Sequence, residues 1–526
     1  MTDLRAELAA WLPRARARAL AFEPAPRREQ VGVVERVGDG VAEVTGLPDV
    51  RLDELVRFSS GAQGLVVRLD ERSFGCFLLG EAEGRVAGGR SVAAGDEVRG
   101  TGSVLKVPVG QGLLGRVIDP LGAPLDGGAP LQPARWDPVE REAPPIADRD
   151  LVTTPLQTGV LVVDAMVPLG RGQRELIVGD RKTGKTAIAV DAIASQRDSD
   201  VISVYAAIGQ KESSVERVVE ALRARAAFDR CLVVVGEASS LPGTQWLAPY
   251  AACSMAEYFR DRGQDVLLVL DDLSQHAIIH RQLSLLLRSP PGREAYPGDV
   301  FYLHGRLLER AAKLAPERGG GSLTALPIAE TQEGNLTAYI PTNLISITDG
   351  QVYLEPKLFY EGHKPAVDVT RSISRVGGQT QAPALRHLSE RLRLEYAQFL
   401  ELESFTRFGG LADERARRSL EHGRRMRALL EQPRLDPLRL SEEVALLLAL
   451  EEHLLDDTPP EGVRAVQARA REVLAARCPA NLARIDHSRE LSPEDRARLL
   501  EVLRDVLGAP APEAPPAEGP PAGAGA

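Results

Sequence analysis

The sequence predicts a multidomain chain: an antiparallel β-barrel near the N-terminus, a central α/β domain, and a C-terminal α-helical bundle. Two observations predict this order. The hydrophobic pattern changes from short valine-rich runs between glycines to alternating strands and helices, and then to helices alone. The length of 526 residues, with 44% hydrophobic and 26% charged residues, is enough for several packed domains.

A proline-containing linker at Pro24–Pro26 separates the first two segments. Leu4, Leu8 and Leu12 recur at helical spacing, so residues 1–28 are predicted as a helical arm. In residues 29–98, short apolar runs alternate with glycine-containing turns such as Gly38-Asp-Gly40. This alternation of short apolar runs and turns is typical of a small antiparallel barrel.

The remaining chain divides into three segments. In residues 99–385, strand-like runs such as Val201–Ala206 and Val266–Leu270 alternate with helical patterns, which predicts a mostly parallel sheet covered by helices. Residues 386–507 keep only the helical pattern, and Ser492-Pro-Glu-Asp495 has the signature of a helix start. Residues 508–526 are rich in proline, alanine and glycine and are predicted to be disordered.

Composition excludes several classes of protein. The four cysteines are far apart and form no CxxC pair, so a disulfide framework is not expected. No run of 18 uninterrupted apolar residues is present, and residues 1–22 lack the apolar block of a secretory signal. The formal net charge of −10 disfavours a protein whose whole surface binds nucleic acid.

One motif carries clear chemistry. The pattern G-x-x-x-x-G-K-[ST] is formed by Gly179, Asp180, Arg181, Lys182, Thr183, Gly184, Lys185 and Thr186. It follows an apolar run and opens a helical pattern, which is the context of a phosphate-binding loop. Backbone N–H groups of such a loop cradle phosphates, the lysine reaches the β- and γ-phosphates, and the Thr186 hydroxyl ligates Mg²⁺. A phosphate-bearing nucleotide and Mg²⁺ are therefore the predicted ligands.

A carboxylate is predicted to complete the magnesium site. Val266–Leu270 reads as a buried strand, and Asp271 follows it directly. Strands of a parallel sheet deliver such a side chain to the edge where phosphates bind. We therefore predict that Asp271 holds the Mg²⁺ shell, with a water molecule between the carboxylate and the ion.

Several longer stretches resemble the alpha subunit of the rotary F-type ATP synthase. The matching stretches are Gly170–Ile177, Ala207–Lys211, Pro290–Asp299, Pro341–Asp349 and Pro365–Ser374. The resemblance covers about residues 28–507 and is strongest in the central domain. It implies a β-barrel, a RecA-like P-loop nucleotide-binding domain and a helical domain, in agreement with the pattern of the sequence.

The resemblance also implies a nucleotide site without turnover. In the catalytic beta subunit of this family, a glutamate positions the attacking water. In this chain Gln210 stands at that place. An amide can hydrogen-bond a water but cannot act as a carboxylate base. The implied function is that of a regulatory subunit that binds MgATP and does not hydrolyse it alone.

Further roles follow from the resemblance alone. Arg375 would reach the nucleotide of the adjacent beta subunit as an arginine finger, with Ser372 fixing the same turn. Lys364, Pro365 and Gln432 match positions of the adenine pocket. The implied partners are the beta subunit in an alternating ring, the gamma central stalk facing Pro290–Asp299, the peripheral stalk and the membrane rotor. The implied location is the cytoplasmic face of the bacterial inner membrane, as a peripheral subunit.

The chain departs from the family pattern at a few positions. Lys182 replaces a glutamine in the phosphate loop, and Arg434 and Leu435 replace a glutamine and a tyrosine of the adenine pocket. The N-terminal arm is hard to align, and the proline-rich tail is extra. These departures indicate a divergent or additional copy of the subunit. The coupling ion and the direction of the reaction stay open.

Two other classes of hexameric ATPase share this order of a small barrel and a phosphate-loop domain or a similar core. A self-sufficient export-type ATPase would carry a glutamate at position 210. A hexameric RNA translocase would show aromatic residues for base stacking in its barrel. Between residues 30 and 98 only Phe58, Phe74 and Phe77 are aromatic, and no RNA-binding pattern stands out. No nucleic-acid partner is therefore expected.

Overall fold

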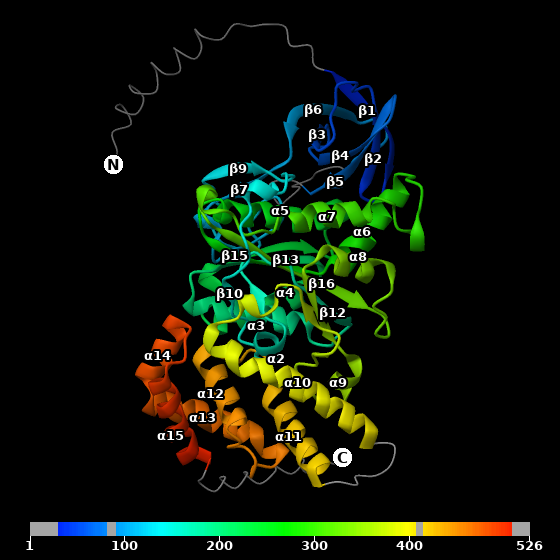
Figure 1. Ribbon diagram of the computed structural model, residues 1–526. Coiled ribbons are helices and arrows are strands. Elements are labelled where there is room, and N and C mark those ends of the chain that lie inside the picture. Colours follow the sequence, from blue (N-terminus) through cyan, green and yellow to red (C-terminus); the bar gives the residue numbers. More distant parts are fainter. Residues whose placement is uncertain (1–29, 81–90, 407–413, 508–526) are drawn as a thin grey trace, which may run out of the picture.

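A computed structural model describes residues 30–80, 91–406 and 414–507. Figure 1 shows three layers from top to bottom: a small barrel, a central sheet with its helices, and a helical domain. The predicted fold class is confirmed. The predicted N-terminal helical arm and the proline-rich tail lie outside the described residues.

The barrel is closed and antiparallel, with the strand order β1-β2-β5-β4-β3-β6. Its interior is filled by alternating apolar side chains, including Val44, Val56 and Phe74, as expected for strands with one buried face. The last barrel strand continues past residue 98, where the sequence placed the domain boundary. The strands are β1 (Val31–Gly38), β2 (Val41–Thr45), β3 (Glu54–Phe58), β4 (Gln63–Leu69), β5 (Ser73–Leu79) and β6 (Glu97–Val104).

The central sheet has eight strands in the order β18-β17-β12-β16-β15-β13-β14-β8. All neighbouring pairs from β17 to β8 are parallel, and β18 pairs with β17 in the antiparallel direction at one edge. The strands are β8 (Val117–Ile118), β12 (Leu176–Asp180), β13 (Ile202–Gln210), β14 (Cys231–Glu237), β15 (Asp265–Asp271), β16 (Ser322–Thr331), β17 (Gly350–Leu354) and β18 (Ile373–Ser374).

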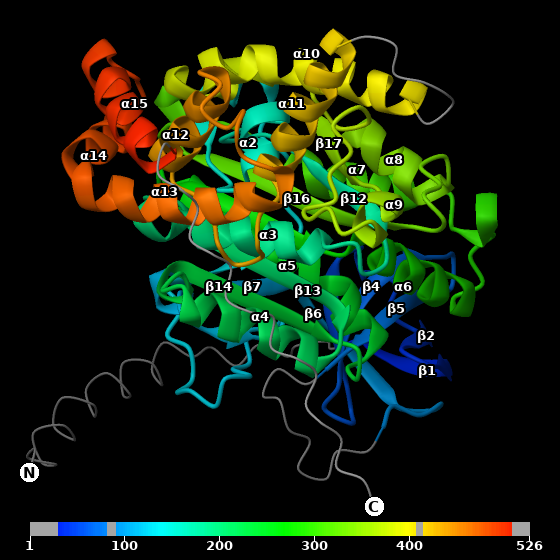
Figure 2. The ribbon, with the colours of Figure 1, turned by 90° about the horizontal axis from the view of Figure 1, so that it is seen from below.

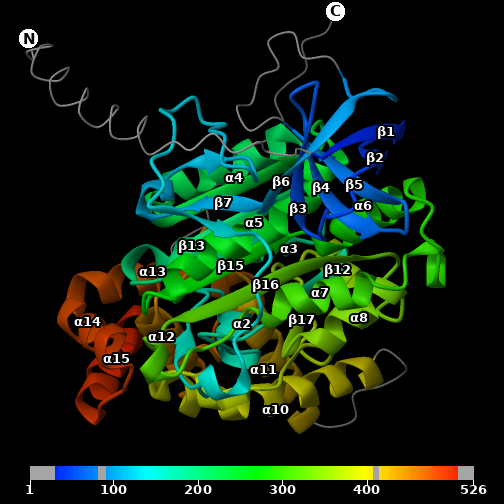
Figure 3. The ribbon, with the colours of Figure 1, turned by 90° about the horizontal axis from the view of Figure 1, so that it is seen from above.

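Helices cover both faces of this sheet, so its strands are buried on both sides. One core contains α2 (Leu161–Met166), α3 (Lys185–Ser195) and α4 (Glu212–Ala224) together with the helical domain. The other core lies toward the barrel and contains four further helices. These are α5 (Pro242–Arg260), α6 (Leu273–Leu286), α7 (Val300–Glu309) and α8 (Tyr339–Ile347). Figure 3 shows the barrel strands lying over α5 and α6.

Short elements connect the layers. Two small antiparallel ribbons pair β7 (Lys106–Val109) with β9 (Arg135–Pro138), and β10 (Pro155–Leu156) with β11 (Leu169–Gly170). The helix α9 (Pro356–Tyr360) follows β17. The proline-rich stretch Pro290–Asp299 forms neither α-helix nor strand and contains one 3₁₀ turn at Arg293–Ala295.

The C-terminal helices pack below the sheet, as Figure 2 shows from that side. The predicted helix start at Ser492 is confirmed, because its hydroxyl accepts a hydrogen bond from the Asp495 backbone N–H at 3.1 Å. The helices are α10 (Pro383–Thr406), α11 (Glu414–Leu430), α12 (Leu440–Glu451), α13 (Val463–Arg477), α14 (Pro479–Ser488) and α15 (Pro493–Leu507).

Two further expectations can be compared with the described residues. All four cysteines are buried and unpaired, so the predicted absence of a disulfide framework holds for these side chains. Within residues 30–80, 91–406 and 414–507, none of the helices combines the length and apolar character needed to cross a bilayer.

Candidate nucleotide-binding site

The phosphate loop joins the carboxyl end of β12 to the start of α3, as the motif predicts. Gly184 directly precedes the helix with a φ of 104°, a left-handed conformation that favours glycine. Because glycine has no side chain, nothing from this residue caps the first N–H groups of α3. These N–H groups and the helix dipole form a site suited to an anion.

Lys185 lies at the centre of the loop and is only 6% exposed. Its ammonium donates hydrogen bonds to the carbonyl oxygens of Gly179 at 3.0 Å and Asp180 at 2.7 Å. Burial lowers the pKa of Lys185, and the carboxylate of Glu330, 3.8 Å from the ammonium, opposes this shift. Asp180, Asp271 and Asp272 act in the same direction as Glu330. A buried cation held by backbone carbonyls at the loop is suited to bind phosphate oxygens.

The two predicted magnesium ligands are in contact. The Thr186 hydroxyl donates a hydrogen bond to Asp271 Oδ2 at 2.8 Å, and the buried Tyr205 phenol donates to the same oxygen at 2.7 Å. Asp272 lies beside them and caps α6 by accepting from the Gln275 N–H at 2.6 Å. Burial and the neighbouring Asp271 raise the pKa of Asp272 to about 7. Clustered hydroxyl and carboxylate oxygens are the donors that Mg²⁺ prefers.

Gln210 ends β13, close to this cluster. Its side-chain amide donates a hydrogen bond to the backbone oxygen of Asp271 at 3.1 Å. The strand β13 follows the phosphate loop in sequence, but β16 and β15 separate it from β12 in the sheet. The strand β13 therefore contributes two neutral groups beside Asp271: the Tyr205 phenol and, at its carboxyl end, the Gln210 amide.

Sequence reasoning missed Glu330, which lies near the end of β16 next to β12. Among the described residues, Glu330 is the one whose carboxylate forms an ion pair with Lys185, at 3.8 Å. The following residue, Thr331, donates a hydrogen bond to Asp180 Oδ1 at 2.6 Å, which ties the loop to β16. An apolar run that ends in glutamate was a signal for this residue, but no motif marks it.

A cavity of about 570 Å³ opens beside the loop, between the sheet and the helical domain. It is lined by loop residues Lys182–Gly184 and by the three predicted adenine-pocket residues, Lys364, Pro365 and Gln432. Phe359, which the sequence did not single out, also lines it, with the Lys364 ammonium 4.8 Å from its ring centre. The volume is within the usual range of small-molecule sites.

The side-chain amide of Gln432 is hydrogen-bonded to backbone groups of the chain. Its amide nitrogen donates to the carbonyls of Gly159 at 2.7 Å and Asp436 at 2.8 Å, and its oxygen accepts from the Leu161 N–H at 3.1 Å. The side chain therefore holds the wall of the cavity together. Arg434, one of the departures from the family pattern, lines the same cavity.

Arg375 follows the edge strand β18 and is exposed, whereas Ser372 is fully buried. The Arg375 guanidinium donates to the backbone oxygens of Thr348 at 3.2 Å and Ile345 at 3.3 Å. No ion pair neutralises it within the part of the chain that the structure describes. The Ser372 hydroxyl donates to the Asp368 carbonyl at 2.6 Å and accepts from the Tyr353 N–H, so it fixes the backbone.

Fold and site together define a phosphate-loop nucleotide-binding protein with a barrel before its sheet and a helical domain after it. Comparison with known proteins gives the same result. Residues 159–374 match the nucleotide-binding domain of the ATP synthase alpha/beta family, and residues 381–506 match the C-terminal domain of the ATP synthase alpha/beta chain.

Named relatives align over most of the chain. It is 55% identical over 501 residues to ATP synthase subunit alpha 2 of Gluconobacter oxydans, covering 95% of this chain and 97% of the relative. It is 54% identical over 514 residues to ATP synthase subunit alpha 3 of Paraburkholderia xenovorans, covering 97% and 96%. The chain therefore belongs to the ATP synthase alpha/beta family, in its alpha-subunit group.

Proposed function

We propose that this chain is the alpha, non-catalytic subunit of a rotary ATP synthase. It binds MgATP at its own phosphate loop and donates Arg375 to the site of an adjacent catalytic beta subunit. ATP synthesis by the complex is coupled to ion translocation. The observation that carries the proposal is at the predicted magnesium ligands: Thr186 and Asp271 are in contact, and β13 ends beside them in the amide of Gln210 and not in a carboxylate.

Different residues bind the phosphates, the magnesium ion and the base of the nucleotide. Lys185 and the first N–H groups of α3 hold the phosphates, and Thr186 and Asp271 hold the magnesium ion that accompanies them. The 570 Å³ cavity lined by Phe359 and Pro365 takes the base. Gln210 donates a hydrogen bond without accepting a proton, so water near the phosphates is not activated by this residue.

The charge of Arg375 supports its role in trans. Backbone oxygens hold the guanidinium, and it makes no ion pair in the described residues. An exposed, unneutralised guanidinium can reach the phosphates of a neighbouring subunit and stabilise transition-state charge. Ser372 acts as a positioning residue, because its buried hydroxyl fixes the segment that carries Arg375.

The proposed assembly follows from membership of the family. The chain alternates with beta subunits in a ring, with Pro290–Asp299 facing a gamma central stalk. A peripheral stalk and a membrane rotor complete the complex at the cytoplasmic face of the bacterial inner membrane. The relatives' names carry the copy numbers 2 and 3, which supports an additional copy of the subunit.

The proposal is tested on the purified full-length chain. Calorimetry with MgATP should show binding, and a phosphate-release assay under the same conditions should show no sustained turnover. In Lys185→Ala we expect affinity to fall about 100-fold or more, because removing one side of a buried charge pair costs about 2–5 kcal/mol. The exposed Lys106→Ala, on β7, is the matched control and should bind as the parent does.

Sustained phosphate release by the chain alone would contradict the proposal and favour an autonomous export-type ATPase. In that case Glu330 is the candidate base, because its carboxylate is 3.8 Å from Lys185. Loss of this turnover in Glu330→Gln would identify it. Stimulation of the turnover by RNA would instead favour the translocase.

A further inference from the structure

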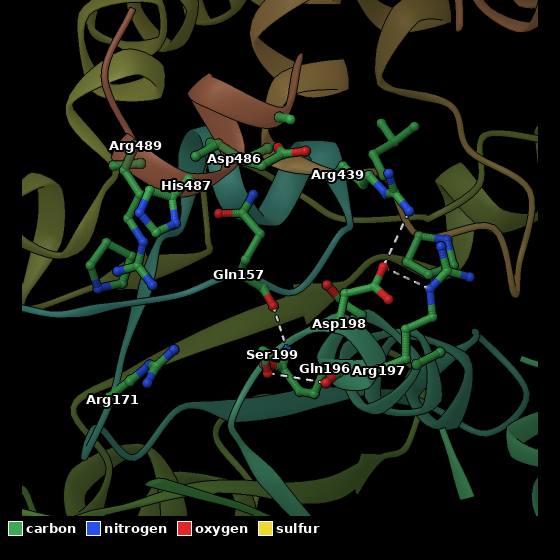
Figure 4. A pocket seen from close by; sticks show the side chains of 18 residues that line it. Gln157, Arg171, Gln196, Arg197, Asp198, Ser199, Arg439, Asp486, His487 and Arg489 are labelled. Carbon is green, nitrogen blue, oxygen red and sulfur yellow. Dashed lines mark hydrogen bonds and ion pairs between the residues drawn. The ribbon is translucent and has the colours of Figure 1, made fainter. Parts of the chain in front are cut away.

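A second cavity, of about 470 Å³, lies at the opposite end of α3 from the phosphate loop. Its walls come from the 3₁₀ turn Gln196–Asp198, the segment Pro437–Leu440 and the end of α14, so it spans the nucleotide domain and the helical domain. It shares no lining residue with the 570 Å³ cavity at the phosphate loop. Figure 4 shows it from close by.

The charged side chains that line this cavity are mostly cationic. There are four arginines and two aspartates: Arg171, Arg197, Arg439, Arg489, Asp198 and Asp486. Both aspartates are already occupied. Asp198 Oδ2 pairs with Arg197 at 3.2 Å and with Arg439 at 3.3 Å, and Asp486 Oδ1 accepts from the Ser441 N–H at 2.8 Å. Arg171 pairs with Asp200 and Asp265, so among the described residues Arg489 is the lining arginine without an ion pair.

Arg489 has no partner for its guanidinium within residues 30–80, 91–406 and 414–507. Figure 4 shows its side chain extending from the helical domain toward Arg171 on the sheet side. Burial and the charge of Arg171 lower the pKa of Arg489, and Asp200 and Asp265, which pair with Arg171, oppose this shift. The aspartates lie on the Arg171 side, so an anion bound between the two guanidinium groups would pair with Arg489 as well.

Arg171 has an unmet donor as well. The residue is 8% exposed, and its Nη1 pairs with Asp265 and with Asp200, the latter at 3.1 Å. Its Nε, however, is buried with no hydrogen-bond partner among the described residues. A buried donor without a partner destabilises the chain, and an oxyanion in this cavity would accept its hydrogen bond.

We propose that this cavity is a second anion site, which binds a phosphate-bearing small molecule between Arg171 and Arg489. A phosphate group offers several oxygens, so it can accept from two guanidinium forks at once. The volume exceeds what one phosphate group needs and leaves room for an organic part. The bound group joins the helical domain to the end of the helix that starts at the phosphate loop.

The test uses the full-length Lys185→Ala chain, in which the proposed nucleotide site is disabled. Calorimetry with inorganic phosphate and with ribose 5-phosphate distinguishes a free phosphate ligand from a phosphate ester. Adding Arg489→Ala should weaken binding of the preferred probe at least tenfold, whereas Arg489→Lys should retain part of it. The control is Arg484→Ala, on α14, the helix that Arg489 directly follows; its guanidinium pairs with Asp495 outside the cavity.

A stability measurement provides a second readout. Each probe that binds should raise the melting temperature of the Lys185→Ala chain but not of the chain that also carries Arg489→Ala. Absence of binding by the Lys185→Ala chain at about 10 mM probe, or equal binding with and without Arg489, would overturn the proposal. Arg489→Ala alone should leave MgATP affinity unchanged, so the two proposed sites can fail independently.

Discussion

At the scale of single residues, the proposal assigns nucleotide binding and the absence of turnover to different side chains. Thr186 and Asp271 stand in contact, as magnesium ligands should, and Lys185 lies in the centre of the loop. At the end of β13, the strand next to β15, the amide of Gln210 donates a hydrogen bond to the Asp271 carbonyl. Binding and turnover therefore depend on different residues, and a chain can keep the first without the second.

Asp191, on α3, gives a prediction about pH. Its Oδ1 accepts a hydrogen bond from the Leu435 N–H at 2.6 Å, and burial raises its pKa from 3.8 to about 7. Between these two values the folded state binds more protons than the unfolded state, so this group's contribution to stability falls as the pH rises. This stabilisation is fully present below the pKa of Asp191 in the unfolded state. It is lost as the pH rises through the pKa of Asp191 in the folded state.

Asp191→Asn removes this dependence, since an amide does not ionise. Relative to the parent, we expect the variant's free energy of unfolding to increase by about 2 kcal/mol between pH 5 and pH 8. Urea unfolding at four pH values in this range measures the difference. If the two stability curves stay parallel, Asp191 does not ionise with a raised pKa.

At the scale of elements, the crossing of α10 and α11 depends on a glycine. A Cβ added at Gly423 would lie 2.1 Å from the Phe399 ring, which no small adjustment relieves. Gly423→Ala should therefore destabilise the helical domain by about 1–3 kcal/mol, as overpacking does. Gly305, in α7, is the matched control, because a Cβ there meets nothing within 4 Å.

Thermal or urea unfolding compares the two variants. Gly305→Ala should leave the chain as stable or more stable by about 0.5–1 kcal/mol, because alanine favours a helix interior. An equal effect of the two substitutions would show that the α10–α11 crossing is not close-packed in solution.

The elements were more predictable from sequence than the site was. Runs such as Val266–Leu270 became strands because an apolar run of this length can be buried on both faces. The positions of Lys185 and Thr186 were also predictable, because both residues belong to one contiguous sequence motif. The sequence did not predict the roles of Glu330 and Phe359, or that Arg171 and Arg489 line one cavity. Each of these residues acquires its role from neighbours that are distant in sequence.

At the scale of the whole molecule, the two proposed functional groups face different neighbours. The phosphate loop and its cavity lie between the sheet and the helical domain. Arg375 follows β18, the strand at the outer edge of the sheet, and is exposed. No hydrogen bond or ion pair joins Arg375 to the phosphate loop within the described residues. Its placement fits action on a site that another subunit completes.

The most direct test of this account measures ATP turnover by the chain assembled with its beta subunit. We predict turnover by the parent assembly and a loss of about 10³–10⁵-fold with Arg375→Ala, the range expected for an arginine finger. MgATP binding by the isolated variant should be unchanged. The control is Arg386→Ala, an exposed arginine paired with Glu390 on α10. Full turnover by the Arg375→Ala assembly would contradict the central claim.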